Sequence, residues 1–484
     1  MLDLPFRSAG QLAAEIQRKT ISSAELLELF LKRIDTYNPQ LNAIITTALP
    51  EARARARAAD DALARGESWG SLHGVPMTIK ESFDVVGMPT TWGVPDLKDN
   101  LPNRNATAVD RFQAAGAILF GKTNVPIYLA DWQSFNEIYG TTNNPWDVAL
   151  SPGGSSGGSA AALAAGLTGL EAGSDIGASI RNPAHYCGVY GHKPTWGICS
   201  PRGQAMPGTV AQTDISVVGP MARSAEDLDL GLSIMAGPEE IEAAGWRLDL
   251  KPSSHHRIAD FKVAVMLDDR CAEVDGAVQE RIAAVAEFLA KSGAKVSDTA
   301  RPAFDMAEIN RVYIGLLRSA TSGRLSDEMV EANLKVARSL GPTDDSYLAR
   351  MARANAMLHR DWLRLNNRRH QLRLAWAEFF REWDVLICPA AASAACPHDH
   401  RGERHERTIM VNGKQVPTTD QLFWAGFSGV AYLPSTVAPA GFTRSGLPVG
   451  VQIVGPQYGD RTTIALARLL EKEFQGFVPP PGFE

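Results

Sequence analysis

Cysteine is scarce in this chain, which has five cysteines among 484 residues. They are widely spaced, at positions 187, 199, 271, 388 and 396. Small secreted folds that depend on disulfides carry a dense and even-numbered set, so this sparse, odd set argues against a disulfide framework. We therefore expect reduced thiols and a cytoplasmic protein.

Long apolar runs and blocks of like charge are also missing. The chain has no stretch of about 18 apolar residues, the length that predicts a transmembrane helix. Its start lacks the basic and apolar regions of a signal peptide. The net charge of −6 is made of interspersed residues of both signs. No basic face is available for nucleic acid or for an anionic membrane, so neither partner is expected.

The remaining composition, 45% hydrophobic and 21% charged, is typical of a globular protein. Residues 8–70 are predicted to be mainly helical, with Ser22 or Ser23 as an N-cap and Gly66 as a helix-ending glycine. Short apolar strands are predicted at 74–80, 260–267 and 383–390, and a helix, a glycine and a strand follow one another at 112–124 and 288–298. This alternation predicts an α/β fold with a parallel or mixed sheet. Residues 398–416 are expected to form an exposed polar loop or hairpin.

Residues 116–123 match the phosphate-binding pattern G-x-x-x-x-G-K-[ST]. A phosphate-binding loop must turn sharply and expose its N–H groups, whereas the four variable positions here are Ala, Ile, Leu and Phe. Such residues favour a buried extended strand, and Pro126 interrupts any helix that would follow. We interpret the segment as a strand that ends in a polar turn, and nucleotide binding is the weaker alternative.

Residues 153–157 match the G-x-S-x-G elbow of α/β-hydrolases, with Ser155 as the nucleophile. That elbow needs an apolar strand before it, but a loop rich in Asn and Pro precedes this one. It also needs a histidine base. His398, His400 and His405 lie in the predicted polar loop, where a solvated or weakly metal-binding segment is the better account. An esterase of the α/β-hydrolase type is kept only as a remote alternative.

Glycine and serine are concentrated in residues 151–183, for which a flexible linker is the simplest interpretation. The middle of this segment, 160–170, is apolar and made of small residues that would pack closely, which a linker does not need. The pattern favours a site built from glycine-rich backbone. A serine nucleophile in it needs a base, and Lys80 can be that base if burial keeps it neutral. The alternative is a strand-end lysine that reaches solvent.

Five ordered segments of the chain resemble the amidase signature family: GVPMTIKESFDVVGMPTT, GTTNNPW, GGSSGGSAAALAAG, GSDIGASIRNPAHYCGVYGHKPT and GLPVGVQIVGP. The likeness runs from about residue 8 to residue 471 and is weakest between 240 and 410. It implies one large α/β domain over 1–484, with a twisted mixed sheet flanked by helices, and neither a metal nor an organic cofactor. It also implies four regions: a helical N-terminal part (about 8–70), a catalytic part (about 71–235), a variable substrate-determining part (about 240–410) and a C-terminal completion of the core (about 417–475).

The resemblance also implies a Ser–Ser–Lys triad. Ser179 is the expected nucleophile, Ser155 the bridging serine that family members hold through a cis peptide bond, and Lys80 the base. The expected oxyanion hole consists of the backbone N–H groups of Ile176, Gly177, Ala178 and Ser179. Ser156 is expected to support Lys80 by hydrogen bonding, and Asp175 and Arg181 are expected to brace the loop.

Residue 178 departs from the family, which usually has glycine where this chain has Ala178. A positive φ at this position would strain an alanine by about 1 kcal/mol or more. The sequence therefore leaves two alternatives: either φ at Ala178 is negative, or the oxyanion hole is slightly reshaped.

The activity implied by the resemblance is hydrolysis of a carboxamide or a related bond, including anilides, carbamates (urethanes) and esters. The motifs have no basic pair beside them that would clearly bind a carboxylate, although Arg181 and Arg202 are near in sequence. We therefore expect a neutral, mainly apolar small molecule as substrate. Four aromatic residues are candidates for lining its pocket, and plain core packing explains each equally well: Trp132, Phe135, Tyr139 and Trp424.

A second function stays open, namely the amide-hydrolysing subunit of a tRNA-dependent amidotransferase. Such a subunit works inside an assembly with other proteins and nucleic acid. A free-standing amidase would act on its small amide or carbamate alone, as a monomer or as a homodimer. Activity of the purified chain on small amides distinguishes the two functions.

Overall fold

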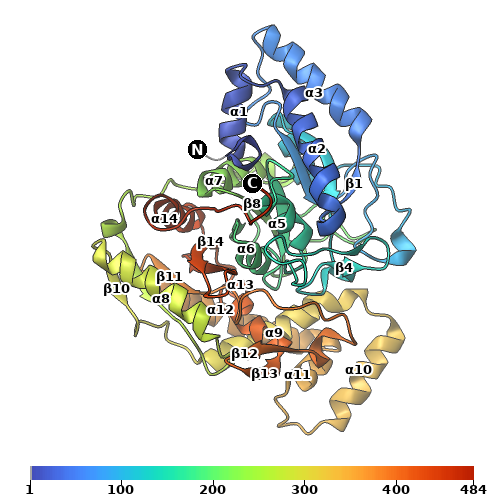
Figure 1. Cartoon of the computed structure of the whole chain (residues 1–484). Helices are drawn as coiled ribbons and strands as arrows, with labels where there is room; N and C mark the ends of the chain where they lie inside the picture. Colours follow the sequence, from blue (N-terminus) through green and yellow to red (C-terminus); the bar gives the residue numbers. More distant parts are fainter. Residues whose placement is uncertain (1–2) are drawn as a thin grey trace.

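The central sheet of the computed structural model, which describes residues 3–484, has eight strands. In chain order these are β6 (Glu171–Asp175), β7 (Tyr190–Lys193), β8 (Val217–Ala222), β9 (Lys262–Val265), β10 (Lys295–Ser297), β11 (Val385–Pro389), β14 (Ser435–Phe442) and β15 (Pro448–Val454). They lie in the order β10-β9-β11-β15-β14-β7-β8-β6. Strand β9 is parallel to both of its neighbours, and the other pairs are antiparallel. The predicted α/β fold with a mixed sheet is confirmed (Figure 1).

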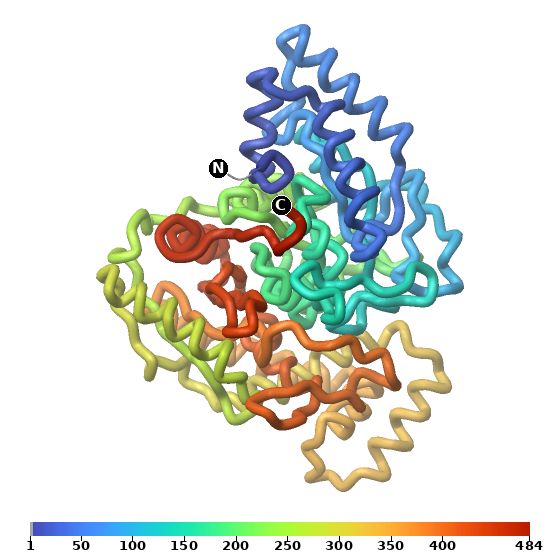
Figure 2. Tube along the Cα trace, in the orientation of Figure 1, coloured from blue at the N-terminus to red at the C-terminus, as the bar shows by residue number. Residues whose placement is uncertain are grey.

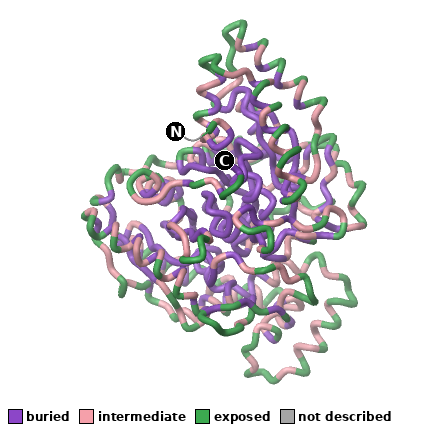
Figure 3. The backbone as a smooth tube through the Cα atoms, in the orientation of Figure 1, coloured by how far each residue is buried: buried purple, intermediate pink, exposed green. Residues whose placement is uncertain are grey.

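Helices flank this sheet because its central strands carry apolar side chains that must be covered. Helices α6 (Arg181–Cys187), α8 (Gly276–Lys291) and α14 (Asp460–Glu473) contact the central strands β14 and β15, and α7 (Ala225–Met235) contacts β8. Every residue of β11 and of β15 is buried. The core of the molecule therefore lies at the centre of the sheet, as the burial colours show (Figure 3).

The N-terminal part is helical, as the sequence predicts, and it carries a small sheet of its own. Its helices are α1 (Ala9–Gln17), α2 (Ser23–Leu41), α3 (Leu49–Ala64) and α4 (Thr107–Ala114), and its strands β1 (Ile44–Thr47), β2 (Pro76–Lys80) and β3 (Ile118–Thr123) are ordered β1-β3-β2. Ser22 caps α2 by accepting a hydrogen bond from the N–H of Glu25, and Gly66, with φ of 80°, follows α3. Strand β1 was not predicted from the sequence.

The last residues of the chain return to this N-terminal part. A guanidinium N–H of Arg33 on α2 donates a hydrogen bond to the carbonyl oxygen of Phe483 at 2.5 Å, and the rings of Phe6 and Phe477 are 6.2 Å apart. The first described residues and the last residues of the chain accordingly lie near each other in the trace (Figure 2). This contact joins the N-terminal helices to the segment that follows the central sheet.

The segment that resembles a phosphate-binding loop is β3, an extended strand rather than a loop. Lys122 is buried and donates hydrogen bonds to the carbonyl oxygen of Pro89 (2.6 Å) and to Thr90 Oγ1 (2.7 Å). Its ammonium group is therefore bound to the protein itself, which agrees with the strand interpretation.

The segment between the sheet strands β10 and β11 is helical and lies at one edge of the molecule (Figure 1). It consists of α9 (Met306–Thr321), α10 (Asp327–Ser339), α11 (Tyr347–Asn355) and α12 (His359–Phe379). Helix α9 buries seven residues, whereas α10 buries none. The predicted polar loop at 398–416 contains the hairpin of β12 (Thr408–Val411) and β13 (Lys414–Pro417).

No helix within residues 3–484 is long and apolar enough to cross a membrane. All five cysteines are free thiols.

At the centre of the fold lies α5 (Gly157–Ala164), whose eight residues are all buried. It contacts β2, β6 and α6, so it sits between the small sheet and the central one. Gly158 is essential to this position, because a Cβ there would collide with the backbone N–H and carbonyl of Asn124 and with the carbonyl of Ala43. Small residues allow this helix to pack against backbone on several sides.

We expect Gly158→Ala to destabilise the protein by roughly 1–3 kcal/mol, because overpacking against backbone cannot be relieved by a change of rotamer. The matched control is Gly341→Ala, since a Cβ at Gly341 would have no atom within 4 Å and this glycine has no positive φ. Denaturant unfolding of the two variants and the wild type measures the difference. Equal midpoints for Gly158→Ala and the wild type would contradict the packing described here.

Candidate active site

The site is built around Lys80, the last residue of β2, whose side chain is fully buried. Its Nζ makes hydrogen bonds with three hydroxyl groups: Ser155 Oγ at 2.7 Å, Ser156 Oγ at 2.9 Å and Ser174 Oγ at 3.0 Å. The strand-end lysine therefore points into the protein and not to solvent. Three segments distant in sequence meet at this one nitrogen.

Burial lowers the pKa of Lys80 to about 7, because desolvation disfavours the charged ammonium form. The negative charges of Asp175, Glu171 and Glu81 act in the opposite direction. Burial also raises the pKa of Glu171, to about 8. A large fraction of Lys80 is therefore a neutral amine near pH 7, and a neutral amine can accept a proton.

The serines at 155 and 156 are held by a loop that only glycines can form. Gly153 has φ of 84°, and the peptide bond between Gly154 and Ser155 is cis. A Cβ at Gly154 would meet backbone atoms of Asp131 and Gln133 at 2.6–2.7 Å. The loop therefore passes through a gap that has no room for a side chain.

The residues before Ser155 do not form the strand that an α/β-hydrolase elbow requires. Strand β5 (Gly140–Thr141), which pairs with β4 (Phe135–Asn136), ends well before it, and irregular loop fills 142–156 up to α5. The structure thus disagrees with the elbow alternative for Ser155.

The second serine loop, 176–180, is clamped by a buried ion pair between Asp175 and Arg181 (2.8 Å). Asp175 also accepts hydrogen bonds from the N–H groups of Ala178 (3.0 Å) and Ile180 (3.1 Å). Burial by itself would raise the pKa of Asp175, but the charge and hydrogen bonds of Arg181 hold it below its usual value. These two residues brace the loop that carries Ser179, and the N–H of Ser156 donates to the Ser179 carbonyl oxygen at 3.1 Å.

Two aromatic side chains fix the carbonyl groups of this loop. Trp132 Nε1 donates a hydrogen bond to the carbonyl oxygen of Gly177 (2.6 Å), and the Tyr313 hydroxyl donates to that of Ile176 (2.9 Å). Within residues 3–484, the N–H groups of Ile176, Gly177 and Ser179 have no hydrogen-bond acceptor. They are thus free to bind an oxygen atom of a ligand.

The predicted four-donor oxyanion hole needs one correction. The N–H of Ala178 is committed to Asp175 Oδ1 at 3.0 Å, so it faces the brace and not a ligand. Three of the four predicted N–H groups remain, from Ile176, Gly177 and Ser179. The bond that removes the fourth donor is part of the clamp that shapes the loop.

Ala178 itself has φ of 71°, so the first alternative left by the sequence, a negative φ, is wrong. A left-handed conformation costs an L-residue other than glycine roughly 1–2 kcal/mol. Asp175 accepts hydrogen bonds from the N–H groups of Ala178 and Ile180, and these two bonds hold the loop in this conformation. The chain tolerates alanine at a position that favours glycine.

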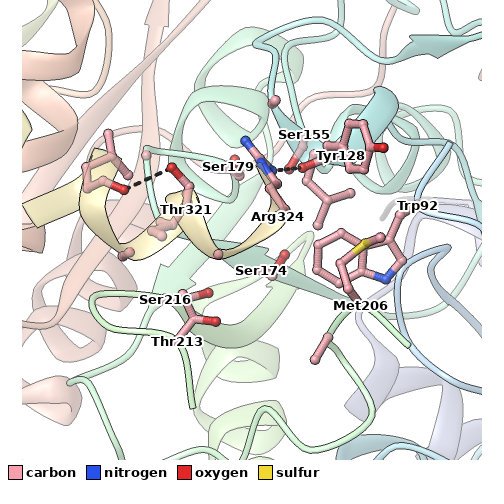
Figure 4. A pocket seen from close by; sticks show the side chains of 18 of the residues that line it. Trp92, Tyr128, Ser155, Ser174, Ser179, Met206, Thr213, Ser216, Thr321 and Arg324 are labelled. Carbon is pink, nitrogen blue, oxygen red and sulfur yellow. Dashed lines mark hydrogen bonds between the residues drawn. The ribbon is translucent and has the colours of Figure 1, made fainter. Parts of the chain in front are cut away.

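A cavity of about 460 Å³ opens onto both serine loops. Ser155, Ser174 and Ser179 line it together with Ile176 and Gly177. Figure 4 shows these hydroxyl groups facing a space that Trp92, Tyr128 and Met206 also border. A volume of this size is typical of a small-molecule site.

Of the four aromatic residues predicted to line the pocket, the structure places only Trp132 there. Trp424 is fully buried, with its Nε1 bonded to the carbonyl oxygen of Ala272. Phe135 stacks on His400 with ring centroids 3.8 Å apart, and Tyr139 is half-buried beside Asn42. The pocket role is corrected for Phe135, Tyr139 and Trp424, because packing elsewhere holds them away from the cavity.

Sequence reasoning missed Ser174 and Gln204. Gln204 Nε2 donates hydrogen bonds to Ser174 Oγ and to Ser82 Oγ, both at 3.1 Å, and so positions one of the three hydroxyl groups around Lys80. Ser174 precedes Asp175 in a motif already singled out, which was the available signal. Nothing in the sequence indicated which way it points.

Within the described part of the chain, no group of three or more His, Cys, Asp or Glu side chains could hold a metal ion. Two histidines of the polar loop make aromatic contacts: the His400 ring stacks on Phe135 and lies 5.6 Å from the His398 ring. The cavity is lined by the hydroxyl groups of Ser155, Ser174 and Ser179, and Lys80 Nζ is hydrogen-bonded to the first two of these.

The sequence of this chain matches the protein-family model for amidases over residues 25–464. The chain belongs to the amidase signature family. It is accordingly an enzyme that hydrolyses amide C–N bonds.

Curated relatives and solved structures agree with this membership. The chain is 33% identical to a glutamyl-tRNA(Gln) amidotransferase subunit of Anaeromyxobacter sp. (strain K), over 99% of this chain and 98% of the relative. It is 31% identical to an acylamidase of Rhodococcus erythropolis, over 97% of this chain and 96% of that protein. Among solved structures, a protein from a vestigial complex related to an s-triazine catabolic enzyme superposes with a TM-score of 0.80 at 28% identity, covering 97% of this chain and 99% of that one.

The positive φ of Ala178 yields a testable difference between two substitutions. Ala178→Gly relieves the left-handed strain, so we expect stability equal to the wild type or higher by up to about 1 kcal/mol. Ala178→Val adds a β-branched side chain at the same φ, and we expect a loss of roughly 2 kcal/mol or more. Denaturant unfolding measures both variants, and a valine variant as stable as the glycine variant would show that φ at this position is negative.

Proposed function

We propose that this enzyme cleaves its substrate through an acyl-enzyme formed on Ser179, with Ser155 as proton relay and Lys80 as base. The observation that carries the proposal is the buried Lys80 Nζ at 2.7 Å from Ser155 Oγ, in a cavity that Ser179 also lines. A serine nucleophile requires a base within hydrogen-bond reach or through one intermediary group.

The hydrogen bonds around Lys80 support Ser155 as the relay. A neutral amine has two hydrogens to donate and one lone pair, so of three hydroxyl neighbours two accept and one donates. Ser156 directs its own hydroxyl to the carbonyl oxygen of Ser174 (3.5 Å), and Ser174 receives a second hydrogen bond from Gln204. We assign Ser155, the nearest of the three hydroxyl groups at 2.7 Å, as the one that donates to Lys80 and accepts a proton from Ser179.

The reaction then proceeds in two steps. Ser179 Oγ attacks the carbonyl carbon as its proton passes through Ser155 to Lys80, and the resulting oxyanion is bound by the N–H groups of Ile176, Gly177 and Ser179. Each such donor is worth roughly 2.7–4 kcal/mol in enzymes where it has been removed. Ser155 returns the proton to the leaving amine, and water releases the acyl group by the reverse path.

The bond cleaved is a carboxamide or a chemically similar bond, such as an anilide, a carbamate or an ester, in a small molecule. Apolar cavity walls beside Ser179, including Trp92, Ile176 and Leu422, suit an alkyl or aryl portion of the substrate. The acylamidase relative and the indoleacetamide hydrolase relative of Bradyrhizobium diazoefficiens (32% identical over 96% of this chain) agree with such a substrate. Residues 240–410 and the loops near the triad, which both contribute to the cavity lining, determine substrate choice in this proposal.

A second candidate function is the amide-hydrolysing subunit of a tRNA-dependent amidotransferase, because a relative with that name is 33% identical over nearly the whole chain. Such a subunit would need partner proteins for its biological activity. Turnover of anilides or carbamates by the purified chain alone supports the free-standing amidase. Activity confined to glutamine would support the amidotransferase role.

We expect Ser179→Ala to abolish hydrolysis, with a loss of roughly 10⁴-fold or more in kcat, because no other group could form the acyl-enzyme. Lys80→Ala and Ser155→Ala each lose several orders of magnitude for lack of a base or a relay. Initial rates with a series of amides, anilides, esters and carbamates measure these losses.

A serine-directed fluorophosphonate supplies the control for this assignment. Peptide mapping should place the label on Ser179 in the wild type and find none in Ser179→Ala. A label on Ser155 alone, or a Ser179→Ala variant of near-normal activity, would refute the assignment.

The lowered pKa of Lys80 predicts the pH dependence. Activity requires the neutral amine, and the ammonium form is the one lost as pH rises. The value of kcat/KM for a neutral anilide should therefore increase tenfold per pH unit below about pH 7 and level off above it. Rates between pH 5 and 10 test this. A rate that is already constant at pH 5, or that is still rising at pH 10, would contradict a base with this pKa.

A further inference from the structure

Three arginines line the cavity that contains Ser179, each from a different element of the variable segment. Arg318 is on α9, Arg324 ends the short helix η6 (Ser322–Arg324), and Arg404 begins the short helix η7 (Arg404–Glu406). In the close-up, Arg324 extends toward Tyr128 (Figure 4). Arg324 Nη1 donates a hydrogen bond to the carbonyl oxygen of Tyr128 at 2.9 Å. Sequence reasoning could not place these residues, because they are far from the motifs.

None of these three arginines forms an ion pair with a carboxylate of residues 3–484. Among the described residues that line this cavity, Asp131 is the one acidic side chain. Its Oδ2 is already paired with Arg407 Nη1 at 2.6 Å, and both side chains are buried. The cavity thus has an excess of positive charge.

Two buried arginines elsewhere in the fold are paired with carboxylates, whereas Arg223, which is also buried, donates to backbone carbonyl oxygens. Arg181 binds Asp175 at 2.8 Å, and Arg369 binds Asp214 at 2.7 Å. The three cavity arginines instead contact aromatic rings: Arg404 lies over Trp132 (5.3 Å), Arg324 over Tyr128 (5.5 Å) and Arg318 over Tyr347 (5.3 Å). These contacts hold the guanidinium groups in position without an ion pair, and the more distant charges of Asp131 on Arg404 and of Glu403 on Arg318 only partly offset their charge.

Arg318 has an unused donor as well as an unpaired charge. Its Nε is buried and has no hydrogen-bond partner in the structure, while an Nη donates to the Tyr347 hydroxyl. Desolvation, followed by the charges of Arg404 and Arg324, lowers the pKa of Arg318 to about 9. A buried donor without a partner and three mutually repelling cations are both unfavourable, and a bound anion would relieve both.

We propose that Arg318, Arg324 and Arg404 bind a carboxylate of the substrate, so that the preferred substrates are amides or carbamates carrying an acidic group away from the bond that is cleaved. The inference rests on the proposed function of Ser179. Guanidinium groups bind carboxylates through paired N–H donors in a fixed planar geometry. The reacting end of such a substrate meets neutral groups and apolar walls, and its acidic end meets the arginines.

This inference replaces the expectation of a wholly neutral substrate. That expectation rested on the lack of a clear basic pair beside the motifs. Arg181 and Arg202, the arginines near in sequence, are engaged with Asp175 and with Glu239 (3.1 Å). The cationic side chains come from 318–404, the region where the sequence offered no pattern for placing side chains in space.

The test compares p-nitroanilides of ω-carboxy acids, from succinyl to suberyl, with neutral analogues in which a methyl ketone replaces the carboxylate. A second pair carries the acid on the amine side, as N-acetyl-4-aminobenzoate and its neutral methyl ketone. The measured quantity is the ratio of kcat/KM for the acid to that for its ketone. We expect a ratio above about tenfold for at least one length or side, falling as salt screens the charges.

Variants identify the arginines responsible. Arg318→Gln, Arg324→Gln and Arg404→Gln should each lower that ratio at least tenfold, and Arg318→Lys should restore part of it. The matched control is Arg311→Gln, an exposed arginine on the same helix that pairs with Asp305 and Asp345 and does not line the cavity. Its ratio should equal that of the wild type. Arg324 is exposed, so its variant remains informative if the substitutions at 318 and 404 fail to fold.

The outcomes separate the two proposals. Ketones preferred at every length and on both sides, or ratios unchanged in all three glutamine variants, would overturn the carboxylate site while labelling of Ser179 left the proposed function intact. A phosphonate-terminated analogue preferred over the carboxylate would overturn the choice of anion. Absence of both labelling and amide hydrolysis would overturn the function itself.

Discussion

The burial of Lys80 is the constraint on which the rest of this site depends. An amine removed from water is tolerated only when its hydrogen bonds are satisfied and its charge can be lost. Three hydroxyl groups, from Ser155, Ser156 and Ser174, meet the first condition at 2.7–3.0 Å. These hydroxyl groups reach the same nitrogen, Lys80 Nζ, because three segments come together there: β2, the glycine loop before α5 and the end of β6. The small residues of α5 make this convergence sterically feasible.

The buried pair of Asp175 and Arg181 then ties this centre to the C-terminal part of the chain. Arg181 Nη1 donates to the carbonyl oxygen of Ala425 on α13 (Leu422–Gly429) at 3.0 Å and to Gln452 Oε1 on β15 at 2.7 Å. Removing one partner of such a pair leaves an uncompensated buried charge. The loop of Ser179 is therefore held by the core of the sheet, and its free N–H groups are positioned before any ligand arrives.

The sequence was informative where the backbone itself is constrained. A Cβ would collide or be strained at three positions, Gly153, Gly154 and Gly158. Because these positions require glycine, the sequence shows a recognisable motif, and Lys80, Ser155 and Ser179 could be identified from that motif and its neighbours. Side-chain direction was not predictable: Ser174 and Gln204 were missed, and Trp424 turned out to be core. The bond from Ala178 to Asp175 was equally hidden, because it depends on a loop conformation that periodicity does not encode.

In the variable segment (about 240–410), the groups that we propose to bind the substrate lower the stability of the free protein. Helix α10 buries no residue, and α9 presents Arg318 to the cavity from its last turn. Unpaired guanidinium groups lower stability, and the large apolar core, to which α9 itself contributes, offsets that cost. The protein can therefore keep charges that are satisfied only when a ligand binds. The serines and the lysine that we propose as reactive groups belong to the buried centre, and the arginines that we propose to select the substrate come from α9, η6 and η7.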